Sequence, residues 1–309
     1  MIVYYLMIAL SALIFALQFM LNDGYQRESG SGWNSSLKFS LYSSIVGFAA
    51  LFVINKFECG FSLFSLTVAV IYSMVCIALN YFTVKALKIA NLSVYSVFSM
   101  IGGMILPFIY GIMCGEEFKA IRVVCCILIS AAVAMNAGRS KESKKAFIYY
   151  MAVFIFNGMV GVISKFHQSY PEYCVGSADF LMLSKIITAV FSVLLIFLSK
   201  ERNFTVSKKA FAYSAGSACL NSIANLLLLI ALLKLPASVQ YPMVTGGVIV
   251  FSTLIEIVRK SKLTKKEITA ALIAFAVSAI LKVKVARFPL YKTSDTLYQP
   301  KLYGIVSIY

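Results

Sequence analysis

The sequence predicts an all-α, polytopic membrane protein with ten transmembrane helices, and three observations support that prediction. Hydrophobic residues make up 61% of the 309-residue chain and its mean hydropathy is +0.87, whereas soluble domains hold about 45–50% apolar residues. Charged residues amount to 13%, too few to cover a globular surface, and they cluster between long apolar runs. These runs are continuously apolar, which favours helices over the alternating strands of a barrel.

Each apolar run is long enough for one helix to cross a bilayer core, which takes roughly 20 residues. The expected spans are 2–21, 35–54, 64–84, 91–113, 119–137, 146–164, 180–199, 210–233, 237–258 and 267–285. No Lys or Arg precedes the first run, so we interpret it as a retained helix and not as a cleaved signal peptide. Residues 286–309 are polar, so a tail outside the bilayer is expected.

The net charge of +16 comes from basic residues scattered over many short loops. Membrane anchoring explains them better than nucleic-acid binding, and we expect the lipid bilayer as a partner and no nucleic acid. Lys and Arg concentrate in the loops after the first, third, fifth, seventh and ninth spans. By the positive-inside rule these loops are cytoplasmic and both termini lie outside.

The seven cysteines form no CxxC pair and lie mostly in the expected helices. We therefore interpret them as packing residues and expect no metal or redox site. The sequence also lacks a phosphate-binding Gly-rich loop, so ATP is not expected, and no cofactor is predicted.

An internal repeat appears at an offset of 145 residues. At this offset Asn80 aligns with Asn225, Gly102 with Gly247, and Ala86 with Ala231. The repeat predicts two five-span halves, 1–140 and 141–285, followed by the tail at 286–309. Because five is odd, the second half must begin on the opposite side of the membrane, which makes the repeat inverted. Inverted repeats are common in secondary transporters.

The fourth and ninth spans hold small residues and prolines at similar places. Proline frees a backbone carbonyl and glycine permits close backbone approach, so one interpretation is a pair of interrupted helices at a binding site. Helix packing is the alternative, and the two are compatible. The predicted helix breaks are Gly102, Gly103, Pro107, Pro242, Gly246 and Gly247.

The stretches 86–118 and 231–258 resemble matching segments of the EamA-like branch of the drug/metabolite transporter superfamily. Gly115-Glu116 is similar to the family's Gly-Glu ending, although Ser261 stands at the related position of the second half. The resemblance covers residues 1 to about 285. It implies ten helices in two inverted halves, a permease of the cytoplasmic membrane, and termini inside the cell, which reverses the orientation expected from the charges.

Uncharged polar residues inside the spans are the candidate contacts for a small-molecule substrate. Amides and hydroxyls in a membrane bind either neighbouring helices or a polar solute. The repeat places Asn80 and Asn225 at equivalent depths, which favours that pair. The substrate-binding candidates are Gln18, Asn80, Tyr95, Ser99, Asn225, Gln240, Tyr241 and Thr245.

Lys38 and Lys185 lie near the starts of the second and seventh spans, where the resembling family often has a base. One interpretation is that both side chains extend to the interface. The other places them at opposite mouths of a pathway, where each attracts an anionic or zwitterionic substrate. Of the twelve acidic residues, Glu256 lies inside a span but near its end, and the others lie in loops, at helix ends or in the tail. Exchange of a proton for a cationic drug is therefore not favoured.

The sequence therefore favours a secondary transporter of a small polar, zwitterionic or anionic metabolite that works by alternating access, not an enzyme. The alternatives are a polytopic membrane enzyme, against which the single histidine and the scattered acids argue, and an accessory subunit that transports nothing. Either a monomer or a homodimer fits.

Overall fold

The computed structural model of the chain describes residues 2–30, 32–89, 92–116, 120–135, 144–199, 202–258 and 265–286. Within these ranges all regular structure is helical, as predicted. The helices are α1 (Ile2–Ser29), α2 (Trp33–Ile54), α3 (Leu63–Ile89), α4 (Leu92–Met113), α5 (Ala120–Met135), α6 (Lys144–Gln168), α7 (Ser177–Leu198), α8 (Lys208–Leu232), α9 (Ala237–Val258) and α10 (Lys265–Ala286). Each expected span thus coincides with a helix. The predicted tail, from residue 287 onward, lies outside the described residues.

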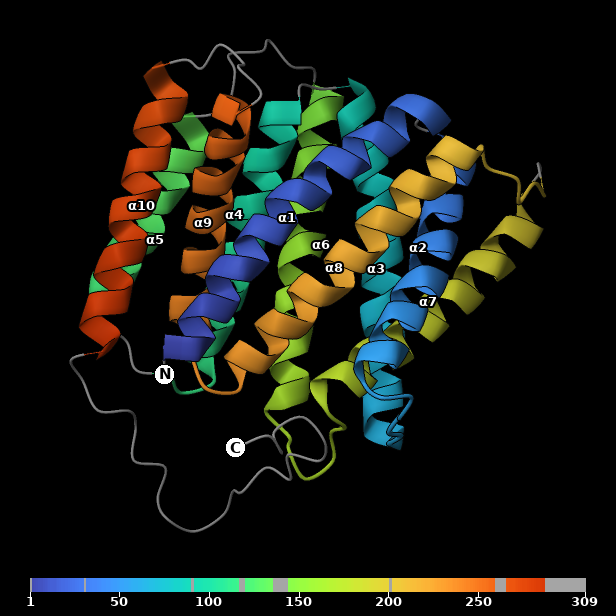
Figure 1. Cartoon of the computed structure of the whole chain (residues 1–309), viewed down its shortest axis with the longest axis horizontal. Helices are drawn as coiled ribbons and strands as arrows, with labels where there is room; N and C mark the ends of the chain where they lie inside the picture. The colour runs from blue at the N-terminus through green and yellow to red at the C-terminus, as the bar shows by residue number, and fades with distance from the viewer. Residues whose placement is uncertain are drawn as a thin grey trace.

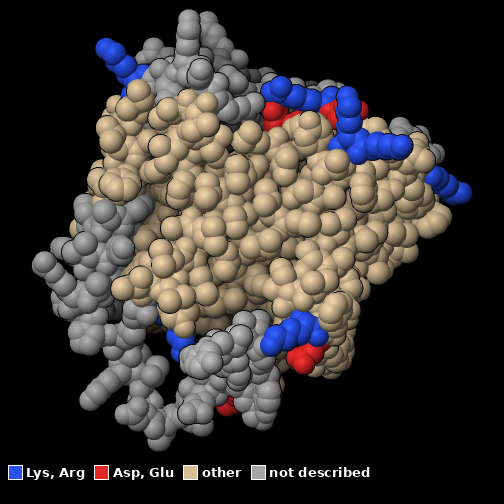
Figure 2. Space-filling view, in the orientation of Figure 1, with Lys and Arg blue, Asp and Glu red and all other residues tan. Residues whose placement is uncertain are grey.

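Length and hydropathy indicate a multi-pass membrane protein. Over the described residues, seven helices, α1–α3 and α6–α9, are long and apolar enough to cross a bilayer. The described apolar stretches of α4, α5 and α10 are shorter: Phe98–Met113, Val123–Ala132 and Ile268–Val277. Figure 2 shows charged side chains near two opposite edges of the molecule, with a broad uncharged band between them. Large apolar side chains face outward, such as Leu272, which is 64% exposed, as expected for contact with lipid.

The helices form one bundle (Figure 1), and its buried apolar residues include two large clusters. One cluster joins α1, α4, α5 and α10, and the other joins α2, α3, α6 and α7, while α8 and α9 contribute to both. The partly buried Tyr241 of α9 packs against both clusters. Helix contacts link distant parts of the chain: α1 packs on α8 and α9, α6 on α3 and α4, α2 on α7 and α8, and α7 on α3. Further contacts join α4 to α9 and α5 to α10.

Glycines set the closest helix contacts. A Cβ atom at Gly102 would lie 2.6 Å from the Cα atom of Phe154, so the backbones of α4 and α6 touch directly. Gly158 faces Leu106 of α4 from the other side of this contact. Similarly, a Cβ atom at Gly247 would lie 2.7 Å from the Cβ atom of Ala12, so that α9 packs closely on α1.

The predicted helix breaks require a correction. α4 and α9 are continuous α-helices with Pro107 and Pro242 inside them, so neither helix is interrupted at its Gly/Pro segment. Close packing accounts for Gly102 and Gly247, and Gly103 leaves room for the side chain of Asn157, whose Nδ2 atom would lie 2.7 Å from an added Cβ. Small residues at such positions let membrane helices approach closely.

Candidate functional site

A polar cavity of about 330 Å³ lies inside the bundle. Its walls come from eight helices, α1–α4 and α6–α9, so both sequence halves contribute. Aromatic side chains, including Phe15, Tyr72 and Tyr241, line it together with amides and hydroxyls. Such a mixture of apolar walls and a few polar groups is typical of small-molecule sites.

Seven of the eight predicted contact residues line this one cavity: Gln18, Asn80, Ser99, Asn225, Gln240, Tyr241 and Thr245. The eighth, Tyr95, has a side chain outside the described part of the structure. Positions that are far apart in the sequence therefore converge, which is the geometry that the hypothesis of a binding site requires.

The amides use part of their hydrogen-bonding capacity on neighbouring helices. Asn80 Nδ2 donates to Ser40 Oγ at 2.7 Å, and Asn225 Nδ2 donates to the Asn221 carbonyl at 2.8 Å. Gln240 Nε2 donates to the Leu228 carbonyl at 2.9 Å, whereas its buried Oε1 atom has no hydrogen-bond partner among the described residues. The hydrogen bonds to neighbouring helices thus leave one buried amide acceptor of the cavity lining, Gln240 Oε1, without a partner among the described residues.

Four further amide residues line the cavity and were not among the predicted contacts: Asn22, Gln26, Asn157 and Asn221. Asn22 lies one turn after Gln18 on α1, and Asn221 lies one turn before Asn225 on α8. Asn221 Nδ2 donates to Gln18 Oε1 at 3.3 Å. Because residues four apart share a helix face, this spacing was a signal in the sequence.

Lys38 and Lys185 occupy different environments. Lys38 Nζ donates to the Thr205 carbonyl at 3.0 Å at an exposed position, and this side chain does not line the cavity. Lys185 does line the cavity, where its Nζ lies 3.4 Å from Asn221 Oδ1. The two lysines therefore do not form a matched pair at opposite mouths.

The cavity has two unlike ends, which we name by a nearby residue. Near the start of α9, at the Glu116 end, lining residues such as Ser164 and Gln240 are buried. Near the last turns of α1 and α3, at the Gln26 end, lining residues such as Gln26 and Thr83 are half-buried. The cavity is thus more accessible at its Gln26 end.

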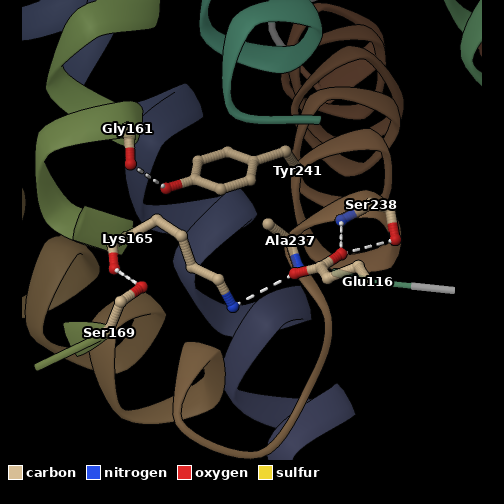
Figure 3. A network of polar contacts seen from close by, with 7 residues as sticks. All are labelled: Glu116, Gly161, Lys165, Ser169, Ala237, Ser238 and Tyr241. Atoms are coloured by element: carbon tan, nitrogen blue, oxygen red, sulfur yellow. Dashed lines mark hydrogen bonds and ion pairs between the residues drawn. The ribbon is translucent and has the colours of Figure 1, made fainter. Parts of the chain in front are cut away.

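A polar network closes the Glu116 end (Figure 3). Glu116 follows α4, and its Oε1 atom lies 3.0 Å from Lys165 Nζ of α6. The same carboxylate accepts hydrogen bonds from the backbone N–H groups of Ala237 at 2.7 Å and Ser238 at 3.0 Å, and from the Ser238 hydroxyl at 2.8 Å. It therefore caps the first turn of α9, where free N–H groups and the helix dipole favour an anion. Tyr241, one turn further along α9, donates to the Gly161 carbonyl at 3.3 Å.

The environment of Glu116 shifts its titration. Burial acts to raise the pKa of this carboxyl, but Lys165 and the hydrogen bonds from Ser238 and Ala237 together bring the pKa below its usual value of 4.5. Glu116 is thus held in its ionised form by these contacts, as expected for a carboxylate beside a cation and a helix N-terminus.

A second carboxylate strengthens the same end. Asp179, in the first turn of α7, accepts hydrogen bonds from Asn55 Nδ2 at 3.0 Å and from the Gly60 N–H at 2.8 Å. These bonds fix the segment between α2 and α3 to the start of α7. The Glu116 end is therefore held by anchors on both sides of the bundle.

His167, the single histidine, has a structural environment. Its Nε2 atom lies 2.9 Å from Ser65 Oγ, which accepts from the Val175 N–H at 2.9 Å, and its ring stacks on Phe180 with centroids 4.0 Å apart. Across the described residues, no three His, Cys, Asp or Glu side chains come together in a way that would hold a metal ion.

Comparison with known proteins shows a solved structure of similar fold but indicates no function. No family model and no curated protein sequence matches the chain. A solved structure described as "Crystal structure of protein" is similar to it with a TM-score of 0.69 and 15% sequence identity, over 92% of this chain and 98% of that chain. The similarity extends over nearly the whole of both chains, so this arrangement of helices also occurs in a solved structure.

Proposed function

We propose that the protein is a secondary transporter that moves a small polar, zwitterionic or anionic metabolite across the cytoplasmic membrane by alternating access. We further propose that its ten helices all span the bilayer as two inverted five-helix repeats, in the manner of the EamA-like transporters that its sequence resembles. The cavity is the observation on which this proposal depends: eight helices from both halves enclose one polar site, whose lining is less buried at one end than at the other.

The helix contacts support the proposed repeat. If every helix is exchanged for its counterpart in the other half, the contact of α1 with α8 becomes that of α6 with α3. The contact of α1 with α9 becomes that of α6 with α4, and the contact of α2 with α8 becomes that of α7 with α3. The contacts α2–α7, α4–α9 and α5–α10 map onto themselves. This correspondence is expected for a pseudo-two-fold axis through the cavity.

Helix directions support the inverted orientation. In the view of Figure 1, α1 begins at the lower edge and runs upward, whereas its counterpart α6 begins at the upper edge and runs downward. The glycine contacts agree, because Gly102 joins α4 to α6 while Gly247, 145 residues later, joins α9 to α1. Two halves of opposite direction around one site are able to expose that site to each side in turn.

Solute flux into proteoliposomes tests the proposal. The protein is reconstituted alone and exposed to amino acids, nucleosides, sugar phosphates and cationic dyes, and we expect uptake of one class above that of protein-free vesicles. Thr245→Trp, which fills the cavity, should abolish this uptake. Leu272→Trp, which adds the same ring at an exposed position on α10, is the matched control and should leave it intact. Equal flux in both variants, or none in the unmodified protein, contradicts the proposal.

A reporter fused to each terminus in turn tests the proposed number of spans. An even number of crossings places both termini on one side of the membrane, and the side on which they lie decides between the charge rule and the family resemblance. Termini on opposite sides would rule out ten spans.

A further inference from the structure

We propose that the cavity selects a small organic monoanion, and that the single carboxylate of this substrate pairs with the ammonium group of Lys185. This inference rests on the proposed transport function and names the class of substrate. It begins from the charge inside the cavity: among the described lining residues, Lys185 is the one charged side chain, and no Asp or Glu accompanies it.

Among the described residues, Lys185 has no anionic partner for its charge. Lys185 Nζ donates a hydrogen bond to Asn221 Oδ1 at 3.4 Å, a long contact to a neutral oxygen. An ammonium group enclosed in a bundle within the membrane is costly unless an anion accompanies it, and intramembrane ionisable residues generally mark ligand or ion pathways. A bound anion would supply the missing charge.

The count of charges narrows the substrate class. One cation is neutralised by one carboxylate. A phosphate monoester, with nearly two negative charges, would leave an excess negative charge in the cavity. A zwitterion would bring an ammonium group to a site with no described acid in its walls, and a cation would be repelled by Lys185. A monocarboxylate is the solute that leaves the occupied site closest to neutral.

The surroundings of Lys185 hold its side chain in place for this role. Gly47 of α2 has no side chain, and a Cβ atom added there would lie 3.2 Å from Lys185 Cε and 2.7 Å from Ser222 Oγ. The lysine stem therefore passes through space that Gly47 leaves free. Beyond the ammonium group, Asn221 hydrogen-bonds Gln18 at 3.3 Å, which links α7, α8 and α1 along one wall.

The repeat shows that this charge is specific to one position. Lys185 aligns with Ser40 at the offset of 145 residues, and Ser40 accepts a hydrogen bond from Asn80 at 2.7 Å. The related place in the first half is thus neutral and already bonded. The uncharged amides of Asn80 and Asn225 line the same cavity and are available to the hydroxyl or carbonyl groups of the substrate.

Matched solutes test the proposal on the purified full-length protein. The probes are gluconate against glucitol and benzoate against benzamide, with phenylalanine as a zwitterion and glycerol phosphate as a phosphate ester. The readouts are the thermal unfolding midpoint and competition for uptake in proteoliposomes. We expect at least one carboxylate to raise the midpoint or compete, and its neutral partner to do so about 10- to 100-fold more weakly, the range expected for a charged hydrogen bond.

Two lysine variants assign the effect to Lys185. Lys185→Gln should remove the preference for the carboxylate while the protein remains monodisperse, and Lys185→Arg should restore part of it. Lys38→Gln alters the lysine that lies outside the cavity and should change nothing. The proposal is overturned if neutral partners, the zwitterion or the phosphate ester act as strongly as the carboxylates, if no carboxylate acts at all, or if Lys185→Gln retains the preference. Flux of a neutral solute without a preference for carboxylates would reject the monoanion proposal and support the transport function. Carboxylate binding without flux of any solute would support the monoanion site and reject the transport function.

Discussion

The two ends of the cavity are held by different chemistry. At the Glu116 end, an ion pair with Lys165 and a helix cap on α9 hold buried residues together. At the Gln26 end, a neutral hydrogen bond from Ser217 Oγ to Asn22 Oδ1 at 2.5 Å joins α8 to α1 beside half-buried side chains. Charge-assisted bonds are roughly twice as strong as neutral ones, so the closed end is the more firmly held.

The proposed repeat accounts for the difference between the ends. At the offset of 145 residues, Lys165 corresponds to Met20 and Glu116 to Ser261. These two side chains are unable to form an ion pair, so the second half lacks the means to copy the closure at Glu116. If the halves exchange roles during transport, closing the Gln26 end must rely on other contacts. In the proposed transport cycle, the two access states would therefore differ in stability.

Removal of the Glu116 carboxylate should give the largest loss of stability. Glu116→Ala leaves Lys165 enclosed without its partner and uncaps α9, so we expect a loss of about 3–5 kcal/mol in the free energy of unfolding. Thermal or denaturant unfolding in detergent measures it. Glu58→Ala, which removes an exposed carboxylate between α2 and α3, is the control and should cost little. Equal losses in the two variants would show that the network does not hold the closed end.

Removal of the cation should cost less. In Lys165→Met, Glu116 keeps its three hydrogen bonds to the start of α9, and we expect a loss of about 1–2 kcal/mol. Lys234→Met alters an exposed lysine and serves as the comparison in the same unfolding assay. A cost equal to that of Glu116→Ala would mean that the ion pair, and not the cap, dominates.

The hydroxyl at the Gln26 end should contribute less still. Ser217→Ala removes one neutral hydrogen bond, and we expect a loss of about 1 kcal/mol or less in the free energy of unfolding. Ser214→Ala is a matched control, because this buried hydroxyl has no hydrogen-bond partner among the described residues and its removal should be neutral. A loss at Ser217 as large as that at Glu116 would erase the difference between the ends.

Protonation of Glu116 should give the smallest effect, because the cost of burying the ionised form offsets much of what its contacts contribute. Its pKa in the folded protein lies below the usual value of 4.5. The stabilisation is therefore complete above pH 4.5 and is lost as the pH falls through the lower, folded-state value. In unfolding curves recorded against pH, the difference between the unmodified protein and Glu116→Gln should stay constant between about pH 5 and 7 and shrink in more acidic solution. A difference that grows on acidification would reverse the assigned direction.

The positions of the helices along the chain were predictable from the sequence, because hydrophobic runs and their lengths are local properties. Each expected span coincides with a helix, and seven polar candidates chosen for their depth in the spans line one cavity. The direction in which each side chain points around its helix axis was harder to predict. Lys38 and Lys185 have similar depths, but they are 147 residues apart, two more than the repeat offset. Two residues rotate a side chain by more than half a turn of a helix, which is why one lysine faces the cavity and the other does not.

Long-range partners could not be deduced from spacing. Glu116 looked like the end of a sequence motif, and nothing local indicated that it would cap α9, which begins at Ala237. The Gly/Pro segments were open to two interpretations, since the same residues suit a broken helix or a close contact. The continuous course of α4 and the backbone contact between Gly102 and Phe154 favour packing there, and only the neighbouring helix makes that evident.

The glycine contact between α4 and α6 has a mechanical consequence. Gly102 and Gly158 bring main chain against main chain or against the base of a side chain, where no rotamer change is available to absorb sliding. In the proposed transport cycle these two helices would therefore move as one rigid block, and a pivot would lie where longer side chains separate the helices.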